Sequence, residues 1–341
     1  DPATGAYKVT LLDNVLHSPG ANENDATVSL GFTVTDNDGS TANGSLQITF
    51  DDDAPTVVAD GAQPTLTVDE SAFGTDASAN FASVFTPTFG ADGAAATNST
   101  TYALGIAVGS TGLVDTLTNQ AVVLSVVGGV VQGRTATSND LVFTLSVAAN
   151  GTVTLDQLRA VVHTPNSGPN QSAGLSADTL ITLTATVTDD DGDTATAVAN
   201  IGQNLVFNDD APVANDDVAG LTEGGPNFVT FDVDTNDSDG ADGFGSRTFT
   251  SLTGTYGTIT INGDGTQTYT LTAAGQTAIN ALAPGATLTD SFTYTLTDKD
   301  GDSDPATLVV TLTGTDDGVT ITNLTPAAQG GDVAVDEDDL P

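Results

Sequence analysis

The chain contains no cysteine, no methionine and no tryptophan, and only 5 of its 341 residues are lysine or arginine. Without cysteine it can form neither a disulfide nor a thiolate metal site. Its 45 acidic residues give a net charge of −40, which repels nucleic-acid phosphates and excludes non-specific nucleic-acid binding. The same charge disfavours anionic membrane surfaces. No apolar run approaches the roughly 18 residues of a membrane helix, so we expect no membrane insertion.

Glutamate is also scarce. Only Glu23, Glu70, Glu223 and Glu337 are present, so 41 of the 45 acids (45 − 4) are aspartate. A surface made acidic for solubility alone would use both residue types. The short aspartate carboxylate suits tight turns and oxygen cages around hard cations. The aspartate excess therefore indicates acidic loops that bind cations.

Helical periodicity is nearly absent, and strand patterns dominate. Apolar and polar residues alternate in ITLTATVTD (181–189) and SFTYTLTD (291–298), with threonine at the outward positions. LDQLRAVVH (155–163) and GQTAINALA (275–283) are expected to form at most a turn or a short helix. Short strands in units of about 100 to 150 residues predict an all-β chain of tandem immunoglobulin-like antiparallel β-sandwich domains in a linear array.

Three stretches, residues 30–55, 181–212 and 291–317, repeat one pattern. Each has an alternating strand, then Thr-Asp-x-Asp-Gly, then a second strand and an acidic end. Asp-Asp-Ala-Pro occurs at 52–55 and again at 209–212, and His-x-Pro at 17–19 and 163–165. Such internal self-similarity is the signature of a repeat protein.

These echoes predict the domain borders. We expect 1–54 to be the C-terminal part of one repeat, 55–211 a complete long repeat, 212–316 a complete shorter repeat, and 317–341 a linker or the start of the next repeat. The junctions are short and contain proline, which favours stiff joints. The expected partners are therefore neighbouring repeats of the same chain, in a monomeric rod. Residue 1 falls inside a repeat, so we expect the chain to be part of something longer.

The Asp-x-Asp-Gly loops are the candidate metal sites. Residues i and i+2 point to the same side, so two carboxylates converge, and Ca²⁺ with about six to eight oxygen ligands relieves their repulsion. Acids at the end of each repeat and the glutamate near the start of the next could add ligands. In the first repeat the pair Asp36 and Asp38 is assigned the end acids Asp52 and Asp53. In the second, Asp189 and Asp191 are assigned Asp209 and Asp210, and in the third, Asp298 and Asp300 are assigned Asp316 and Asp317. The acids near repeat starts are Asp69, Glu70 and Glu223.

A second acidic loop, DVDTNDSDG (232–240), is a further candidate for one ion. Its ligands would include Asp232, Asp234 and Asp237. An EF-hand is excluded, because that loop needs glycine at position 6 and glutamate at position 12. The alternative for all these acids is that they are solvated turn residues. Recurrence in register favours calcium.

No enzymatic activity is expected. The histidines of the two His-x-Pro turns are interpreted as structural hydrogen-bonding residues rather than catalytic or zinc-binding ones. There is no Gly-x-Ser-x-Gly elbow to hold a nucleophile beside a base. Aspartate pairs can perform acid–base work in glycosidases. An active site would not be expected to recur at the end of every repeat.

The residues resemble a known family. Residues 55–211, with LTVDES, VTLDQLRAVVHTP, VTDDDGDTATA and a closing NDDAP, resemble a repeat of type I secreted giant adhesins, and 1–54 resembles the end of the same repeat. Residues 212–316 resemble the shorter cadherin-like or VCBS-type repeat, through NDDVAGLTEGG and DSFTYTLTDKDGD. The resemblance implies an RTX adhesin at the bacterial cell surface, in which tandem Ca²⁺-bound β-sandwiches extend terminal binding domains for adhesion and biofilm formation.

Two functions remain open at this level. The first is a calcium-stiffened extender. The second is a calcium-dependent module that binds a sugar or peptide, with a pocket in the extra segments around 81–112. The absence of tryptophan and the presence of only 5 tyrosines leave few aromatic platforms for a sugar. Adhesins of this kind can carry a Thr-Ala-Ala-Gly protease site, but we interpret TAAG at 272–275 as an ordinary strand-to-turn segment.

Overall fold

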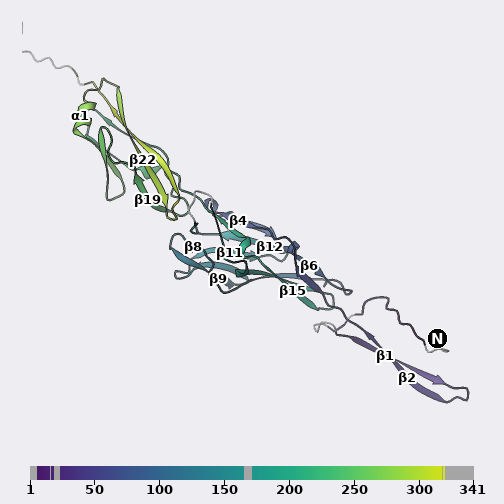
Figure 1. Ribbon diagram of the computed structural model, residues 1–341. Helices are drawn as coiled ribbons and strands as arrows, with labels where there is room; N and C mark the ends of the chain where they lie inside the picture. The colour runs from purple at the N-terminus through teal and green to yellow at the C-terminus, as the bar shows by residue number, and fades with distance from the viewer. Residues whose placement is uncertain (1–5, 16, 19–23, 165–170, 317, 319–341) are drawn as a thin grey trace, which may run out of the picture. The chain divides into compact units, whose positions relative to one another are not determined.

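The computed structural model describes residues 6–15, 17–18, 24–164, 171–316 and 318 (Figure 1). The chain forms two compact units. Unit 1 comprises residues 1–213 and two later segments, 238–247 and 296–304. Unit 2 comprises residues 214–237, 248–295 and 305–341. Within the described ranges, no helix has the length and apolar character needed to cross a membrane.

Unit 1 is built from antiparallel sheets and one parallel strand pair, β16 with β4. The largest sheet has the order β5 (Ala77–Asn80), β12 (Thr152–Gln157), β11 (Leu141–Val147), β10 (Val130–Thr135), β9 (Gln120–Val127) and β8 (Val114–Asp115). The smaller sheets have the orders β13 (Ser172–Gly174), β16 (Leu205–Asn208), β4 (Leu66–Asp69); β15 (Thr194–Asn200), β14 (Ile181–Thr188), β7 (Thr100–Ile106); and β3 (Thr56–Ala59), β6 (Phe85–Thr88). The short 3-10 helices are η1 (Glu70–Ala72), η2 (Ala82–Val84), η3 (Asp178–Leu180) and η4 (Gly202–Asn204).

The alternation read in the sequence places the core of unit 1. Along β14 the residues at every second position, from Ile181 to Val187, are buried while the threonines between them are partly exposed. Phe143 of β11 packs on Phe207 of β16, with ring centroids 5.3 Å apart. Sheets that bury one face against each other in this way form a β-sandwich.

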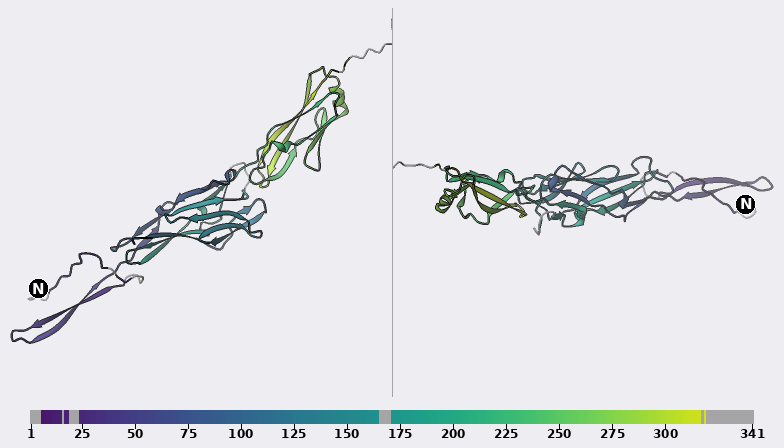
Figure 2. Two further views of the ribbon diagram at one scale, coloured as in Figure 1. Left: turned by 180° about the vertical axis from the view of Figure 1, so that it is seen from behind. Right: turned by 90° about the horizontal axis from the view of Figure 1, so that it is seen from above.

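A two-stranded hairpin precedes this core. Strands β1 (Ala26–Thr35) and β2 (Thr41–Phe50) pair antiparallel from Ala26–Phe50 to Thr35–Thr41, and Figure 2 shows them as a twisted ribbon. Leu30 and Phe32 of β1 are 51% and 53% exposed. The corresponding residues of β14, Leu183 and Ala185, are fully buried. The hairpin thus carries the sequence of a core strand with its apolar face open to solvent.

Unit 2 contains two further sheets. Their orders are β17 (Asp217–Thr222), β23 (Ser303–Thr313), β22 (Thr287–Asp298), β19 (Phe244–Phe249); and β18 (Phe228–Phe231), β21 (Gln267–Leu271), β20 (Gly257–Ile261). The β19, β22 and β23 residues that fall within 238–247 or 296–304 belong to unit 1. Helix η5 (Val233–Thr235) and α1 (Ala273–Ile279) complete the elements. The core groups Tyr269, Ile279, Phe292, Leu308 and Leu312.

The prediction of an all-β fold is confirmed, and the two doubtful stretches are resolved. GQTAINALA lies partly in α1, whose first turn is capped by Thr272: its hydroxyl oxygen accepts from the Gly275 N–H at 3.1 Å. The Thr-Ala-Ala-Gly segment is therefore the start of a capped helix. LDQLRAVVH is not helical: it begins in β12 and continues to Val161, which bridges to Asp115.

Candidate metal centres

The Asp-x-Asp-Gly loops of β14–β15 and β22–β23 have the same internal hydrogen bonds. Oδ1 of Asp189 accepts from the Gly192 N–H at 3.1 Å and from the Asp193 N–H at 2.7 Å. Oδ1 of Asp298 accepts from Gly301 at 2.9 Å and from Asp302 at 2.8 Å. Both glycines have positive φ, 100° and 113°, which side chains disfavour. One oxygen of the first aspartate thus fixes the loop, and the other is left for a ligand.

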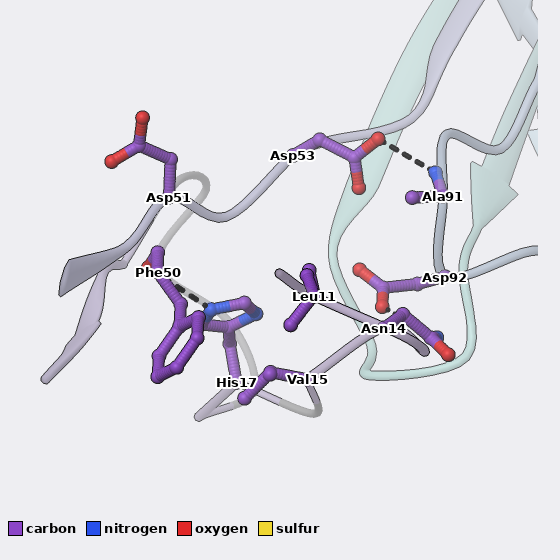
Figure 3. Close-up of a pocket in the computed structure, with 9 residues that line it drawn as sticks. All are labelled: Leu11, Asn14, Val15, His17, Phe50, Asp51, Asp53, Ala91 and Asp92. Atoms are coloured by element: carbon purple, nitrogen blue, oxygen red, sulfur yellow. Dashed lines mark hydrogen bonds between the residues drawn. The ribbon is translucent and has the colours of Figure 1, made fainter. Parts of the chain in front are cut away.

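The first cluster of acids surrounds the β14–β15 loop. Ligand atoms of Asp189, Asp191 and Asp193 lie within 4.8 Å of one another, and so do those of Asp191, His17, Asp52 and Asp92. Cluster 1 is these two sets taken together. Nδ1 of His17 lies 2.9 Å from Oδ1 of Asp52. Figure 3 shows His17 beside Phe50, and it shows Asp92 on a separate loop. All six residues except Asp92 are buried.

The second cluster surrounds the β22–β23 loop within unit 1. It contains three sets of residues, and within each set the ligand atoms lie within 4.8 Å of one another. The sets are Glu70, His163 and Asp209; Glu70, Asp209, Asp210 and Asp242; and Asp209, Asp300 and Asp302. Cluster 2 is these seven residues. Nδ1 of His163 lies 3.1 Å from Oδ1 of Asp209 and 3.6 Å from Oδ2 of Asp300. Residues far apart in the sequence thus converge on a single buried carboxylate, Asp209.

The two clusters are copies of one arrangement. Oδ2 of Asp53 accepts from the Ala91 N–H at 2.7 Å, a bond drawn in Figure 3. Oδ2 of Asp210 accepts from the Ala241 N–H at 2.8 Å. Each alanine stands in Gly-Ala-Asp-Gly, at 90–93 and 240–243, and the aspartate of that motif enters its cluster.

Several buried oxygens in the clusters are left for a cation. Within the described ranges, no hydrogen-bond donor reaches Oε2 of Glu70, Oδ2 of Asp209 or Oδ2 of Asp302. The same holds in cluster 1 for Oδ2 of Asp189 and both oxygens of Asp191. Buried carboxylates without donors are costly unless a positive charge compensates them. These carboxylate oxygens are suitable ligands for a hard divalent cation, which prefers oxygen ligands.

Burial, together with neighbouring charges, raises the pKa of four cluster acids. Burial raises the pKa of Glu70 to about 9, although the Val161 N–H opposes this. Burial, together with Asp300, Asp209 and Asp210, raises the pKa of Asp242 to about 7. Burial raises the pKa of Asp189 and of Asp302 to about 6. These four carboxylates therefore resist ionisation without a cation, and a bound cation favours their ionised form.

His163 is the positive group of cluster 2. Burial lowers its pKa, but hydrogen bonds to Asp209 and Asp300 outweigh burial and raise the pKa to about 10. Its Nε2 lies 3.1 Å from the Phe207 carbonyl oxygen. Without a metal ion, His163 is thus protonated on Nδ1 and hydrogen-bonded to the acids around it.

The clusters contain seven of the 18 predicted ligands, and not in the predicted groups. Asp209 was expected beside Asp189 and lies instead beside Asp300 and Asp302. In the same way, Asp52 joins Asp191 rather than Asp36. The reason is the extended chain: β15 and β16 run away from the 189–193 loop at about 3.3 Å per residue, so the end acids emerge far from the loop of their own repeat.

Other predicted ligands lie outside clusters 1 and 2. Asp36 and Asp38 are exposed on the β1–β2 turn, where Oδ1 of Asp36 accepts from the Ser40 N–H at 2.9 Å. Asp69 caps η1 through the Ser71 N–H, and Glu223 accepts from the Thr315 N–H at 3.0 Å. Asp298 orients its loop, as described. Asp316 is exposed and accepts from Gly318 N–H, while Asp317 lies outside the described residues.

The second acidic loop has a structural arrangement of its own. Asp232 caps η5 through the Asp234 N–H at 3.1 Å. Asp237 accepts from the Asn215 N–H at 2.7 Å and from the Tyr294 hydroxyl at 3.1 Å. These bonds use the acids to fix the loop.

Sequence reasoning missed four cluster residues, Asp92, Asp193, Asp242 and Asp302. Two signals could have found them. Gly-Ala-Asp-Gly occurs twice, and an aspartate directly follows Asp-x-Asp-Gly in two of the three loops, where the first has Ser40.

Two of the pockets in the described ranges are small. A pocket of about 150 Å³ next to cluster 1 is lined by residues including Leu11, His17, Phe50 and Asp92 (Figure 3). A second, of about 250 Å³, has an apolar lining from Ile106 to Gly109 and from Val123 and Leu124. Both are below the roughly 300 Å³ typical of small-molecule sites.

Residues 65–202 match the model of a domain of unknown function (DUF5801), and residues 209–314 match that of the bacterial cadherin-like domain. The comparison with curated proteins found no match. Among solved structures, the protocadherin GammaB4 extracellular domain is 14% identical, with a TM-score of 0.28 over 84% of this chain and 38% of that one.

An endo-fucoidan hydrolase from glycoside hydrolase family 107 is 15% identical, with a TM-score of 0.22 over 85% of this chain and 34% of that one. Drosophila N-cadherin EC1-4 is 12% identical, with a TM-score of 0.25 over 86% of this chain and 59% of that one. The chain thus spans between 34% and 59% of the length of these three structures. On the match over residues 209–314, the chain contains a cadherin-like β-sandwich repeat.

Proposed function

We propose that the chain is a calcium-stiffened extender segment of a large bacterial surface adhesin, which projects binding domains for adhesion and biofilm formation. The observation that carries the proposal is the pair of equivalent buried clusters, each with carboxylate oxygens that no donor reaches in the described ranges. The bacterial cadherin-like match supports a place in an extracellular adhesion protein. Export as an RTX adhesin by type I secretion belongs to the same proposal.

The chain's own residues would do the mechanical work. Ca²⁺ would supply the positive charge that allows the carboxylates of each cluster to ionise together. In cluster 2, Glu70, Asp209 and Asp242 come from three distant segments, and holding them at one point fixes those segments relative to one another. Asp298 and Asp210 contribute by orienting the backbone of two loops. Thus the cluster crosslinks unit 1 without a disulfide.

The net charge fits a chain that folds where calcium is abundant. At low calcium the 45 acids repel one another, and in cluster 2 His163 is a single positive group among six acids. An ion bound only by the folded state stabilises it by about 2.7 kcal/mol per site at a hundredfold excess over its dissociation constant. The chain would stay open during export and fold at the cell surface. We propose no catalytic role for it, and a monomeric rod as its form.

Small-angle scattering tests the proposal. We expect the wild type to be extended and rigid in about 5 mM Ca²⁺ and flexible in EGTA. Asp209→Asn should bring the calcium profile towards the EGTA profile, whereas Asp36→Asn, on an exposed turn, should not. Coincident wild-type profiles in both buffers would overturn the proposal. Calcium-dependent glycan-array hits for residues 55–211 would favour the ligand-binding alternative.

A further inference from the structure

Both histidines are oriented in the same way. Nε2 of His163 lies 3.1 Å from the carbonyl oxygen of Phe207, and Nε2 of His17 lies 3.4 Å from that of Phe50. A carbonyl oxygen only accepts, so Nε2 carries the hydrogen in each ring. In the neutral ring the lone pair is then on Nδ1. In each case that lone pair faces a carboxylate cluster.

The surroundings of Nδ1 have the dimensions of a coordination shell. In cluster 1 the ligand atoms of His17, Asp52, Asp92 and Asp191 all lie within 4.8 Å of one another. In cluster 2 the same is true of His163, Glu70 and Asp209. Two ligands that are each about 2.1 Å from a metal lie roughly 3 to 4 Å apart. Of the observed Nδ1 to carboxylate distances, 3.1 Å in cluster 2 lies at the lower end of that range and 2.9 Å in cluster 1 lies just below it.

Burial separates these sets from ordinary surface acids. His163 is 1% exposed and Glu70 is 2% exposed, and Oε2 of Glu70 has no donor in the described ranges. Asp191 is 5% exposed, and both its oxygens lack a donor there. Polar side chains buried to this degree and aimed at one point are an independent sign of a missing ligand.

The donor set decides the class of ion. Calcium and magnesium prefer oxygen ligands alone, whereas imidazole nitrogen suits zinc and its neighbours in the first transition row. Metal-binding histidines characteristically donate their second N–H to a carbonyl or carboxylate, which fixes the ring. Phe50 and Phe207 supply such carbonyls. The other occupant of the same space is a proton on Nδ1, giving an imidazolium paired with aspartate.

We propose that His17 and His163 each ligate a zinc-class divalent transition metal through Nδ1, at a mixed nitrogen and oxygen site. The ligands in cluster 1 are His17, Asp52, Asp92 and Asp191, and in cluster 2 they are His163, Glu70 and Asp209. Carboxylates of the two sets, Asp209 in cluster 2 and Asp52 in cluster 1, bridge this metal and the calcium proposed above, and the remaining cluster acids complete the calcium shell. This inference rests on the proposed cation binding of the two clusters and adds a second metal class to it.

Cobalt(II) titration of the full chain tests this, because Co²⁺ replaces zinc and absorbs visible light. The chain is first saturated with Ca²⁺, and its calcium stoichiometry is measured by calorimetry. We then expect visible absorption that saturates at about two equivalents of Co²⁺ and is lost when Zn²⁺ is added. His17→Asn and His163→Asn should each remove one equivalent, and the double variant both. The matched control, Asp36→Asn, should keep two.

Three outcomes separate the readings. Calcium binding without Co²⁺ absorption, or absorption unchanged in the double variant, overturns the histidine sites and leaves the calcium proposal standing. Co²⁺ binding without calcium binding overturns the calcium proposal and leaves the histidine sites standing. If a histidine variant fails to fold by circular dichroism, X-ray absorption of the Zn²⁺-loaded wild type decides: we expect an imidazole in the shell, and an oxygen-only shell overturns the inference.

Discussion

Nδ1 of His163 and Oδ1 of Asp209 lie 3.1 Å apart, and both side chains are almost completely buried. The same pair recurs as His17 and Asp52 at 2.9 Å. Two copies of one buried contact, each with a Gly-Ala-Asp-Gly loop beside it, show that the unit of repetition includes the acidic centre as well as the sandwich. What binds at one centre is therefore expected at the other.

Asp209→Asn should weaken calcium binding at cluster 2 and leave cluster 1 intact. Asp209 belongs to all three sets of ligand atoms in cluster 2, so its charge serves every arrangement there. We expect the calcium affinity of cluster 2 to fall tenfold or more, on the scale of lost supporting ligands. Calorimetric titration should show one class of sites weakened and one unchanged. Equal weakening of both classes would contradict independent centres.

The ion pair of Asp115 and Arg159 should stabilise unit 1. Nε of Arg159 lies 2.6 Å from Oδ1 of Asp115 and Nη2 lies 2.9 Å from Oδ2, and the Asp115 carboxylate is fully buried. Arg159→Met leaves that charge unpaired and should lower the free energy of unfolding by about 3 kcal/mol in urea. Arg134→Met, where the guanidinium contacts Gln132 and the Asn139 carbonyl, should cost less than about 1 kcal/mol.

The same pair makes a pH prediction. Burial raises the pKa of Asp115, but Arg159 and Thr118 outweigh it and the net pKa is lowered. A lowered folded pKa gives stability that is complete above the unfolded value, near 3.8, and is lost as the pH falls through the folded value. The stability difference between wild type and Asp115→Asn should stay constant from pH 7 to about pH 4 and shrink below it. A difference that shrinks already at pH 6 would rule this account out.

Asp290 should be a structural acid of unit 2. Its carboxylate accepts from the N–H groups of Thr255, Tyr256 and Gly257 at 2.8 to 3.0 Å and from the Tyr269 hydroxyl at 2.7 Å. Asp290→Ala leaves the buried Gly257 N–H and Tyr269 hydroxyl and two partly buried N–H groups without an acceptor, and we expect a loss of about 3 kcal/mol or more on urea unfolding.

The matched control for Asp290 is Asp264→Ala. Asp264 accepts from the Thr266 hydroxyl at 2.7 Å, but on an exposed turn. Water can replace that acceptor, so the loss should be below about 1 kcal/mol. Similar losses in the two variants would show that the Asp290 network adds nothing special.

Gly133→Ala should overpack the core of unit 1. A methyl group on Gly133 would overlap the ring of Phe143, which is fully buried. Overpacking typically costs about 1 to 3 kcal/mol, measured here as a lower midpoint of urea unfolding. Gly31→Ala, where a methyl group meets nothing within 4 Å, is the control and should change the midpoint little. An unchanged Gly133→Ala midpoint would contradict the packing described.

The fold could be predicted from period-two patterns, because the alternation within a strand shows which of its residues are apolar and so face the core. ITLTATVTD has its buried face from Ile181 to Val187, as the alternation requires. The hairpin of β1 and β2 has the same pattern, yet Leu30 and Phe32 are exposed. Alternation shows which side of a strand is apolar. It does not show whether another sheet covers that side, because this depends on residues elsewhere in the chain.

The candidate centres were harder to predict, since they depend on where strands end. The sequence marks Asp189, Asp191, Asp298 and Asp300 as carboxylate pairs, but it does not show that Asp209 emerges next to the later loop. Two strand lengths separate Asp209 from Asp189. Asp92 and Asp242 were missed because a lone aspartate in a Gly-Ala-Asp-Gly segment is typical of a turn residue. Their role follows from the Asp53 and Asp210 bonds that hold those loops in place.

Thermal unfolding across a calcium series tests the central claim most directly. The account predicts that the unfolding midpoint of the wild type rises with Ca²⁺ concentration, and that Asp209→Asn combined with Asp52→Asn removes most of that rise while Asp36→Asn leaves it. Saturating calcium should add about 2.7 kcal/mol per site at a hundredfold excess. A wild-type midpoint that is the same in EGTA and in millimolar calcium would contradict the claim that these buried acids are cation sites.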